Sequence, residues 1–233
     1  MAYRLVVLAS GTGTLLQSLI DACAAGSVPA QIVAVGTDRD GTAAASRADA
    51  AGIPTFTCRV SDYEDRAAWD EALTQTCAGF RPDLVVSAGF LKLFGPRFLD
   101  EFSGRCINSH PALLPSFPGM HGVRDALAYG VKVTGCTVFL VDSGLDSGPV
   151  IAQAAVAVRD DDDEETLTER IKAGERVLLA ETVAAMASRG WSVTGRTVRI
   201  GGPQHGHAPQ HGPRTPQQHP SDPQPQPKEV SKQ

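Results

Sequence analysis

Two side chains that could share one chemical task lie close together in the sequence, at Asn108 and His110. They fall at the end of a short β-prone run, residues 105–108, and precede a proline. In an extended chain, residues two apart project to the same side, so both would face one ligand. An amide can stabilise an oxyanion while an imidazole transfers a proton. A histidine before a proline is as often structural as catalytic, so the pair alone leaves both interpretations open.

A candidate partner for this histidine lies in a glycine-rich turn further along the chain. Asp146 falls between two β-rich segments, 131–141 and 150–158. An aspartate close to a histidine orients the imidazole, favours its protonated form and can take a proton through water. An aspartate in a turn more often hydrogen-bonds to its own backbone. Asp142 lies in the same turn and competes for the role, so residue types leave the partner open.

An anion site is indicated near the start of the chain. Residues 10–14, Ser-Gly-Thr-Gly-Thr, form a segment that we call the glycine loop, between a strand pattern and a helix pattern. Backbone amides at a helix N-terminus bind anions, and glycines let the backbone approach a ligand closely. The loop lacks the Lys-Ser/Thr of a Walker A motif, and Leu16 replaces the third glycine of G-x-G-x-x-G. The pattern favours a phosphate monoester over a dinucleotide, with a plain tight turn as the alternative.

The elements that would position these residues alternate between strand and helix. Continuous β-prone runs indicate strands buried on both faces, at 5–8, 31–35 and 84–87. Periodic apolar residues indicate helices at 15–20, 43–51, 63–78 and 166–188. This order predicts an α/β, Rossmann-like fold, with a mostly parallel sheet and helices on both faces. The two later β-rich segments predict a hairpin that extends the sheet in mixed orientation at its C-terminal end.

Composition and charge limit the classes of function. Hydrophobic residues make up 42% of the 233 residues and charged residues 20%, which is usual for a globular protein. The formal net charge of −5 gives no overall field that would attract nucleic acid or a membrane surface. Five scattered cysteines without a C-x-x-C pair favour buried thiols over disulfides or zinc, so we expect no metal. With no signal-like or membrane-spanning run, we expect a cytoplasmic protein.

The composition changes near residue 201. Residues 1–200 have the pattern of one folded domain, whereas residues 201–233 are dominated by Pro, Gln, His and Gly. Such a segment cannot bury enough apolar surface to offset its ordering entropy, which predicts a disordered tail. Its four histidines suggest metal capture only as an incidental property: His205, His207, His211 and His219.

Four segments carry longer motifs. They are SGTGTLLQSLI (10–20), SAGFLKLFGP (87–96), INSHPALLPSFPGMHG (107–122) and VDSGLDSGPVIAQ (141–153). N-x-H-P-x-L-L-P followed by L-D-x-G-P-V resembles the folate-dependent formyltransferases and is specific for that superfamily. The SGxGxxLQ loop is similar to the members that act on glycinamide ribonucleotide in purine biosynthesis. With the helices between these segments, the resemblance covers about residues 3–199.

The resemblance implies a reaction and a catalytic group. A formyl group would pass directly from 10-formyltetrahydrofolate to the amine of glycinamide ribonucleotide, giving N-formylglycinamide ribonucleotide and tetrahydrofolate. The family's catalytic Asn, His and Asp correspond to Asn108, His110 and Asp146. Asn108 and protonated His110 would stabilise the oxyanion of a tetrahedral intermediate, while Asp146 would support the imidazolium and help relay the proton of the amine. The enzyme would be a monomer or a homodimer without nucleic-acid or membrane partners.

The resemblance also implies binding residues. The phosphate would be held by Gly13, Thr14 and Leu15. The folate pocket would include Leu91, Lys92, Leu93, Phe94, Asp142, Ser143, Gly144 and Leu145. Other positions that would contact nucleotide or folate are Arg66, Lys172, Ala173, Gly174 and Glu175.

Four positions depart from the family pattern. Thr14-Leu15 replaces a common Ser-Asn, which keeps backbone contacts but removes a side-chain amide. Phe139 stands where many relatives have histidine, and we expect this change to tune activity rather than abolish it. Ser109 replaces a common isoleucine, and its side chain should point away from the site.

Other functions remain as alternatives. Methionyl-tRNA formyltransferase would be expected to have a further C-terminal RNA-binding domain, and formyltetrahydrofolate deformylase an N-terminal regulatory domain. A nicotinamide-dependent oxidoreductase would need the missing third glycine and an acidic residue after the second strand, for which Asp38 is the best candidate. A non-catalytic nucleotide sensor would have no use for Asn108, His110 and Asp146 together.

Overall fold

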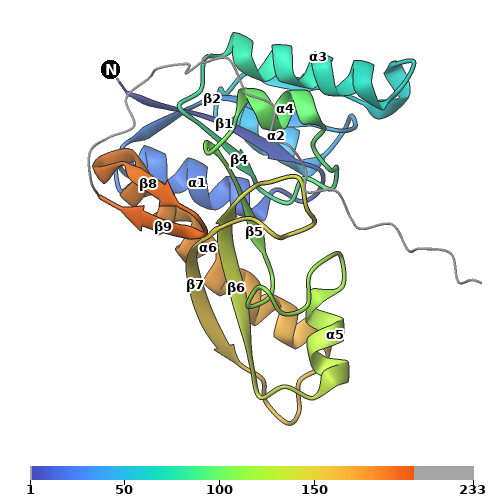
Figure 1. Cartoon of the computed structure of the whole chain (residues 1–233), viewed down its shortest axis with the longest axis vertical. Coiled ribbons are helices and arrows are strands. Elements are labelled where there is room, and N and C mark those ends of the chain that lie inside the picture. Colours follow the sequence, from blue (N-terminus) through green and yellow to red (C-terminus); the bar gives the residue numbers. More distant parts are fainter. Residues whose placement is uncertain (1, 202–233) are drawn as a thin grey trace, which may run out of the picture.

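A seven-stranded sheet forms the centre of the protein (Figure 1). The computed structural model describes residues 2–201, so the predicted tail, apart from residue 201, lies outside the described residues. In chain order the strands are β1 (Tyr3–Ala9), β2 (Ala30–Thr37), β3 (Thr55–Thr57), β4 (Leu84–Ser87), β5 (Cys106–His110), β6 (Val133–Leu140) and β7 (Val150–Ala157). A separate antiparallel hairpin follows, with β8 (Trp191–Thr194) and β9 (Thr197–Ile200).

Six α-helices and one short 3₁₀ helix connect these strands within residues 2–201. They are α1 (Thr14–Ala24), α2 (Ala43–Ala50), the 3₁₀ helix η1 (Val60–Asp62), α3 (Arg66–Gly79), α4 (Pro96–Glu101), α5 (Gly122–Tyr129) and α6 (Glu164–Arg189). None of the helices in this described part, including the 26-residue α6, has an apolar stretch long enough to cross a membrane.

The strand order explains where ligands can bind. The sheet runs β3-β2-β1-β4-β5-β6-β7, and every pairing from β3 to β5 is parallel. The β5–β6 and β6–β7 pairs are antiparallel, which confirms the predicted mostly parallel, Rossmann-like sheet with a mixed C-terminal extension. Because β1, β4 and β5 are parallel, the loops that follow them all leave from the same side of the sheet, the side formed by the carboxyl ends of these strands. Open α/β sheets bind ligands at this carboxyl edge.

Alternate residues of β1 face two different helical layers. Leu5 and Val7 belong to a core cluster with buried residues of α1, α2 and α6. Val6 and Leu8 belong to a second cluster with buried residues of α3 and α4. Both faces of the strand are therefore apolar, as its continuous β-prone run predicts. Figure 1 shows α3 and α4 on one side of the sheet and α1 and α6 on the other, which confirms the predicted coverage of both faces.

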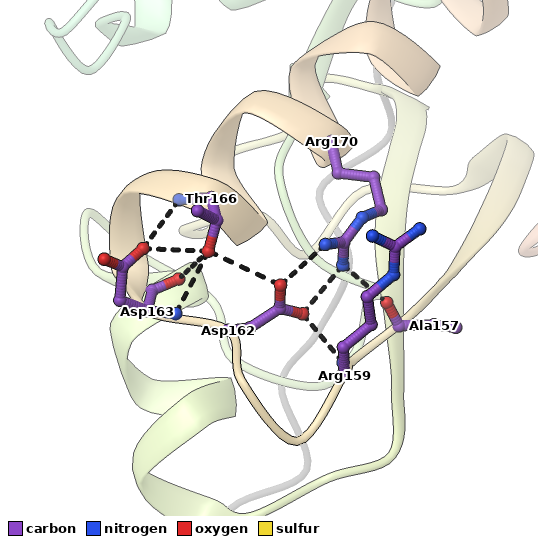
Figure 2. A network of polar contacts seen from close by, with 6 residues as sticks. All are labelled: Ala157, Arg159, Asp162, Asp163, Thr166 and Arg170. Carbon is purple, nitrogen blue, oxygen red and sulfur yellow. Dashed lines mark hydrogen bonds and ion pairs between the residues drawn. The ribbon is translucent and has the colours of Figure 1, made fainter.

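A polar network fixes the start of α6, the helix that carries residues 172–175 (Figure 2). Asp163 accepts from the backbone N–H of Thr166 at 2.8 Å, and the Thr166 hydroxyl accepts from the backbone N–H of Asp163 at 3.0 Å. Asp162 binds the Arg170 guanidinium through both carboxylate oxygens, at 2.6 and 2.7 Å, and accepts from the Arg159 N–H at 2.7 Å. The acidic run before the helix thus supplies its cap and holds the connection from β7.

All five cysteines are free thiols, and four of them are buried: Cys58, Cys77, Cys106 and Cys136. Burial raises the pKa of each of the five thiols, in the case of Cys136 to about 11. The scattered spacing of the cysteines correctly indicated separate thiols rather than a disulfide framework.

Candidate active site

His110 ends β5 and is almost completely buried, with 4% of its surface exposed. Its Nδ1 atom lies 3.5 Å from a carboxylate oxygen of Asp146, and its Nε2 atom lies 2.8 Å from the carbonyl oxygen of Phe117. Both neighbouring oxygens are hydrogen-bond acceptors. An imidazole with a proton on each nitrogen can therefore donate in both directions.

Asp146, rather than Asp142, is the aspartate that meets His110. Asp146 has a left-handed backbone with φ of 49°, and the oxygen facing His110 also accepts from the Gly119 N–H at 2.8 Å. Asp142 closes its own turn instead, accepting from the Gly144 N–H at 3.1 Å and the Ser147 hydroxyl at 2.7 Å. The structure thus separates two aspartates that the sequence left as alternatives.

Asn108 lies on the same side of β5 as His110, because the two residues are two positions apart in one strand. It is half-buried and pairs across the sheet with Phe139 of β6. Its side-chain amide makes no hydrogen bond to another residue of the described range 2–201. Ser109 has the opposite orientation and donates to Glu175 of α6 at 2.7 Å. The alternation of β5 therefore separates the face with Asn108 and His110 from a structural contact behind it.

The glycine loop leads from β1 into α1. Gly13 is the N-cap of α1 with φ of 68°, and no side chain among the described residues caps this helix. The N–H groups of Thr14 and Leu15 in the first turn have no acceptor within the helix. The Leu15 side chain is buried in the core, so only its backbone can contact a ligand. One strand separates β1 from β5, so these two strands lie roughly 10 Å apart, and the glycine loop follows the carboxyl end of β1.

The segment from Leu91 to Phe94, predicted for the folate pocket, lies in the loop after β4. Leu91 and Leu93 are 61% and 65% exposed, respectively, and Leu145 in the β6–β7 loop is 57% exposed. Arg66 donates to the Leu93 carbonyl at 2.6 Å, so the structure brings these two predicted positions together. Exposed leucines on an anchored backbone offer apolar surface to a flat aromatic ligand.

Asp38 anchors the loop after β4 through Lys92. Lys92, also predicted for the folate pocket, lies 3.1 Å from Asp38, and Arg39 lies 3.0 Å from it. Although burial opposes the shift, hydrogen bonds from Arg39, Lys92 and Ser10 lower the pKa of Asp38. The Asp38 side chain is 1% exposed, so it is not available to bind the ribose of a dinucleotide. This arrangement counts against the nicotinamide-dependent alternative.

The predicted α6 segment divides into an exposed and a buried part. Lys172 pairs with Glu169 at 3.0 Å on the surface, and Ala173 is exposed. Gly174 is half-buried and Glu175 is 5% exposed. Burial raises the pKa of Glu175, while the Ser109 hydrogen bond and the nearby His110 act in the opposite direction. Glu175 therefore joins α6 to the strand that carries His110.

Sequence reasoning missed several residues that complete the site. The Phe117 carbonyl contacts His110 and the Gly119 N–H contacts Asp146. These are backbone contacts, which residue types do not predict. Arg47 of α2 donates to the Thr12 carbonyl of the glycine loop at 2.9 Å. Its only signal in the sequence was a cation in the helix after the second strand.

Residues 2–201 contain no group of three or more His, Cys, Asp or Glu side chains that could hold a metal ion. A cavity of about 410 Å³, lined by residues between 113 and 134, contains none of the predicted site residues. Phe117, whose carbonyl contacts His110, is among the residues that line this cavity.

Comparison with known proteins identifies the family of this chain. Residues 3–183 match the formyl transferase family. The chain is 61% identical over 198 residues to phosphoribosylglycinamide formyltransferase of Mycobacterium tuberculosis, covering 85% of this chain and 91% of that protein. It is 39% identical over 175 residues to the Escherichia coli protein of the same name, covering 75% and 82%. Glycinamide ribonucleotide transformylase 1 of Symbiobacterium toebii superposes with a TM-score of 0.84 at 40% identity, covering 86% and 95%. The chain belongs to the formyl transferase family.

Proposed function

We propose that this protein transfers the formyl group of 10-formyltetrahydrofolate to the amine of glycinamide ribonucleotide. The products are N-formylglycinamide ribonucleotide and tetrahydrofolate, a step of purine biosynthesis. The observation that carries the proposal is the contact between His110 and Asp146, at the sheet edge where the glycine loop also lies. The relatives at 61% and 39% identity carry the name of this activity.

The catalytic side chains would act on the formyl carbon. The lone pair of the amine attacks that carbon, and the electrons of the C=O bond become an oxyanion. The Asn108 amide and the His110 imidazolium would donate hydrogen bonds to this oxygen, with the oxygen replacing the Phe117 carbonyl at Nε2. Asp146 would hold Nδ1 and stabilise the positive ring. The amine loses a proton, N10 of the folate gains one, and the bond between N10 and the formyl carbon breaks.

The two substrates would enter from different parts of the edge. The backbone amides of Gly13, Thr14 and Leu15 would hold the ribose phosphate at the start of α1. The leucines of the loop after β4 and of the β6–β7 loop would cover the folate ring system. The strand order supports a position of the amine, attached to the far side of the ribose, near the carboxyl end of β5, since only β4 lies between β1 and β5.

A labelled-formyl assay tests the proposal. Purified protein is mixed with glycinamide ribonucleotide and with 10-formyltetrahydrofolate labelled in the formyl carbon. The label in the nucleotide, the label in formate and the amount of tetrahydrofolate are then measured. We expect tetrahydrofolate to appear only with the amine present and the label to enter the nucleotide. Label released as formate without the amine would indicate hydrolysis, and no amine-dependent release would contradict the proposal.

We further propose that residues 1–200 carry the whole of this activity as one domain. The predicted site residues all lie between Gly13 and Glu175. A chain that ends after residue 200 should therefore turn over at the rate of the full chain, with an unchanged circular dichroism spectrum. Lost turnover with an unchanged spectrum would require a functional role for residues 201–233.

A further inference from the structure

Helix α2 contacts the glycine loop through the side chain of Arg47. The guanidinium is half-buried and donates from Nε to the Thr12 carbonyl at 2.9 Å. A second nitrogen of the same group donates to the side-chain oxygen of Gln17, on α1, at 3.0 Å. One planar group therefore spans the loop and the helix that follows it.

These contacts set the direction of two successive peptide groups. The backbone N–H of Ala44 donates to the Gly11 carbonyl at 3.2 Å, next to the bond from Arg47 to the Thr12 carbonyl. The only cis peptide bond in residues 2–201 is Leu114-Pro115, so both peptides are trans. In a trans peptide the C=O and N–H point in opposite directions. Because both carbonyls face α2, the N–H groups of Thr12 and Gly13 point away from it.

The backbone of Gly13 continues this arrangement into α1. Gly13 has φ of 68° and ψ of 29°, and Thr14 begins the helix. A left-handed residue beside a right-handed one turns successive N–H groups toward one concave, anion-binding surface. A β-carbon at Gly13 would lie 2.7 Å from the Cα of Ala44, so the loop and α2 are in close contact. The orientation of the Gly11–Thr12 and Thr12–Gly13 peptides therefore depends on the groups that bind their carbonyl oxygens.

We infer that Arg47 is the positioning residue of the phosphate subsite, an inference that rests on the proposed function. Arg47 holds the far side of the Thr12–Gly13 peptide and orients its N–H toward the phosphate. Its positive charge also polarises that peptide in the direction that strengthens the N–H as a donor. Since the guanidinium binds the carbonyl side of the peptide, it acts through the loop rather than as a direct phosphate ligand.

Substrates with and without the phosphate separate this role from a general structural one. The change Arg47→Met removes the donors and the charge and keeps a long side chain. For glycinamide ribonucleotide we expect KM to rise about tenfold, equivalent to about 1.4 kcal/mol, with kcat changed less than about twofold. KM for 10-formyltetrahydrofolate should stay constant. With glycinamide riboside, which lacks the phosphate, the variant and the parent should have equal kcat/KM.

Two further variants serve as rescue and control. Arg47→Lys keeps the charge but has a single donor nitrogen that cannot span Thr12 and Gln17, so it should reverse only part of the rise in KM. Arg97→Met removes an arginine of α4 that is 59% exposed and whose side chain pairs with Glu71 rather than with the glycine loop. It loses the same charge and should keep every kinetic constant of the parent. Thermal unfolding of all three variants identifies any that are not folded.

Calorimetry with ribose 5-phosphate makes the inference independent of turnover. We expect Arg47→Met to bind this probe about tenfold more weakly than the parent, and Arg97→Met to bind it equally well. Equal affinity in Arg47→Met, equal losses on the phosphorylated and unphosphorylated substrates, or no binding by the parent would overturn the role of Arg47. If Arg47→Met binds ribose 5-phosphate more weakly as expected, but the parent does not formylate glycinamide ribonucleotide, the proposed function alone is overturned.

Discussion

Replacing Asp146 by asparagine removes one charge from the site and changes little else. The residue has φ of 49°, a region that Asn and Asp tolerate better than other side chains except glycine. The oxygen that faces His110 also accepts from the Gly119 N–H, so the new amide should keep its oxygen there. The substitution therefore tests the carboxylate charge with the backbone and the size of the side chain preserved.

The distance gives the size of the effect. At 3.5 Å, two unit charges attract each other by about 5 kcal/mol when the effective dielectric constant is about 20. The amide dipole and rearranged water recover part of this energy for the imidazolium of His110. Since about 1.4 kcal/mol corresponds to a factor of ten in rate, we expect kcat to fall by at least about 10²-fold. Affinity for glycinamide ribonucleotide should change little, because we propose that its phosphate binds at the glycine loop.

The assay combines turnover and calorimetry on three variants: Asp146→Asn, His110→Ala and the double variant. If the two residues act as a unit, the second substitution should add only a small further loss of kcat. Thermal unfolding checks that each variant is folded. Losses that simply multiply, or a single variant that keeps kcat within a few-fold of the parent, would refute the reasoning.

Three further predictions concern other parts of the structure. Arg170 holds the pKa of Asp162 well below its usual range, so this pair stabilises the fold at neutral pH and the effect disappears as pH falls through the lowered pKa. Urea unfolding should show Asp162→Asn less stable than the parent at pH 7, with the difference vanishing in strong acid. Gly13→Val, whose β-carbon would meet Ala44, should raise KM for glycinamide ribonucleotide much more than KM for the folate in steady-state kinetics. Burial raises the pKa of Glu175, so its stability contribution is present below the unfolded pKa and is lost as pH rises through the folded one. Glu175→Gln should gain stability relative to the parent as pH rises, whereas a constant difference would contradict this reasoning.

The predicted elements were confirmed where apolar residues formed a clear continuous or periodic pattern. β1 and α1 are examples: β1 contributes buried residues to both core clusters, and α1 contributes to the first. The eight-residue α5 was missed, since it follows a Pro/Gly-rich loop and is held by packing of Val123 and Ala126 rather than by a capping side chain. The β8–β9 hairpin was also missed, although Gly195 between β-branched residues was a usable turn signal.

The site shows a different limit of sequence reasoning. Motifs supplied Asn108, His110 and Asp146 through a resemblance, whereas residue types alone left Asp142 as an equal choice. Only the three-dimensional structure shows that Asp142 accepts hydrogen bonds from Gly144 and Ser147 of its own turn. Contacts made by backbone atoms, such as the Phe117 carbonyl at His110, depend on tertiary packing and have no signature in the sequence.

The buried thiols make this chain a natural subject for chemical labelling. The thiolate is the reactive form, so a raised pKa and burial together slow modification at neutral pH. Cys77 and Cys106 belong to one core cluster and Cys136 to another, so each becomes reactive only when its own part of the domain opens. Cys106 begins the strand that ends at His110. The rate at which mass spectrometry detects its alkylation therefore measures how often β5 is exposed, and bound substrate should slow that rate.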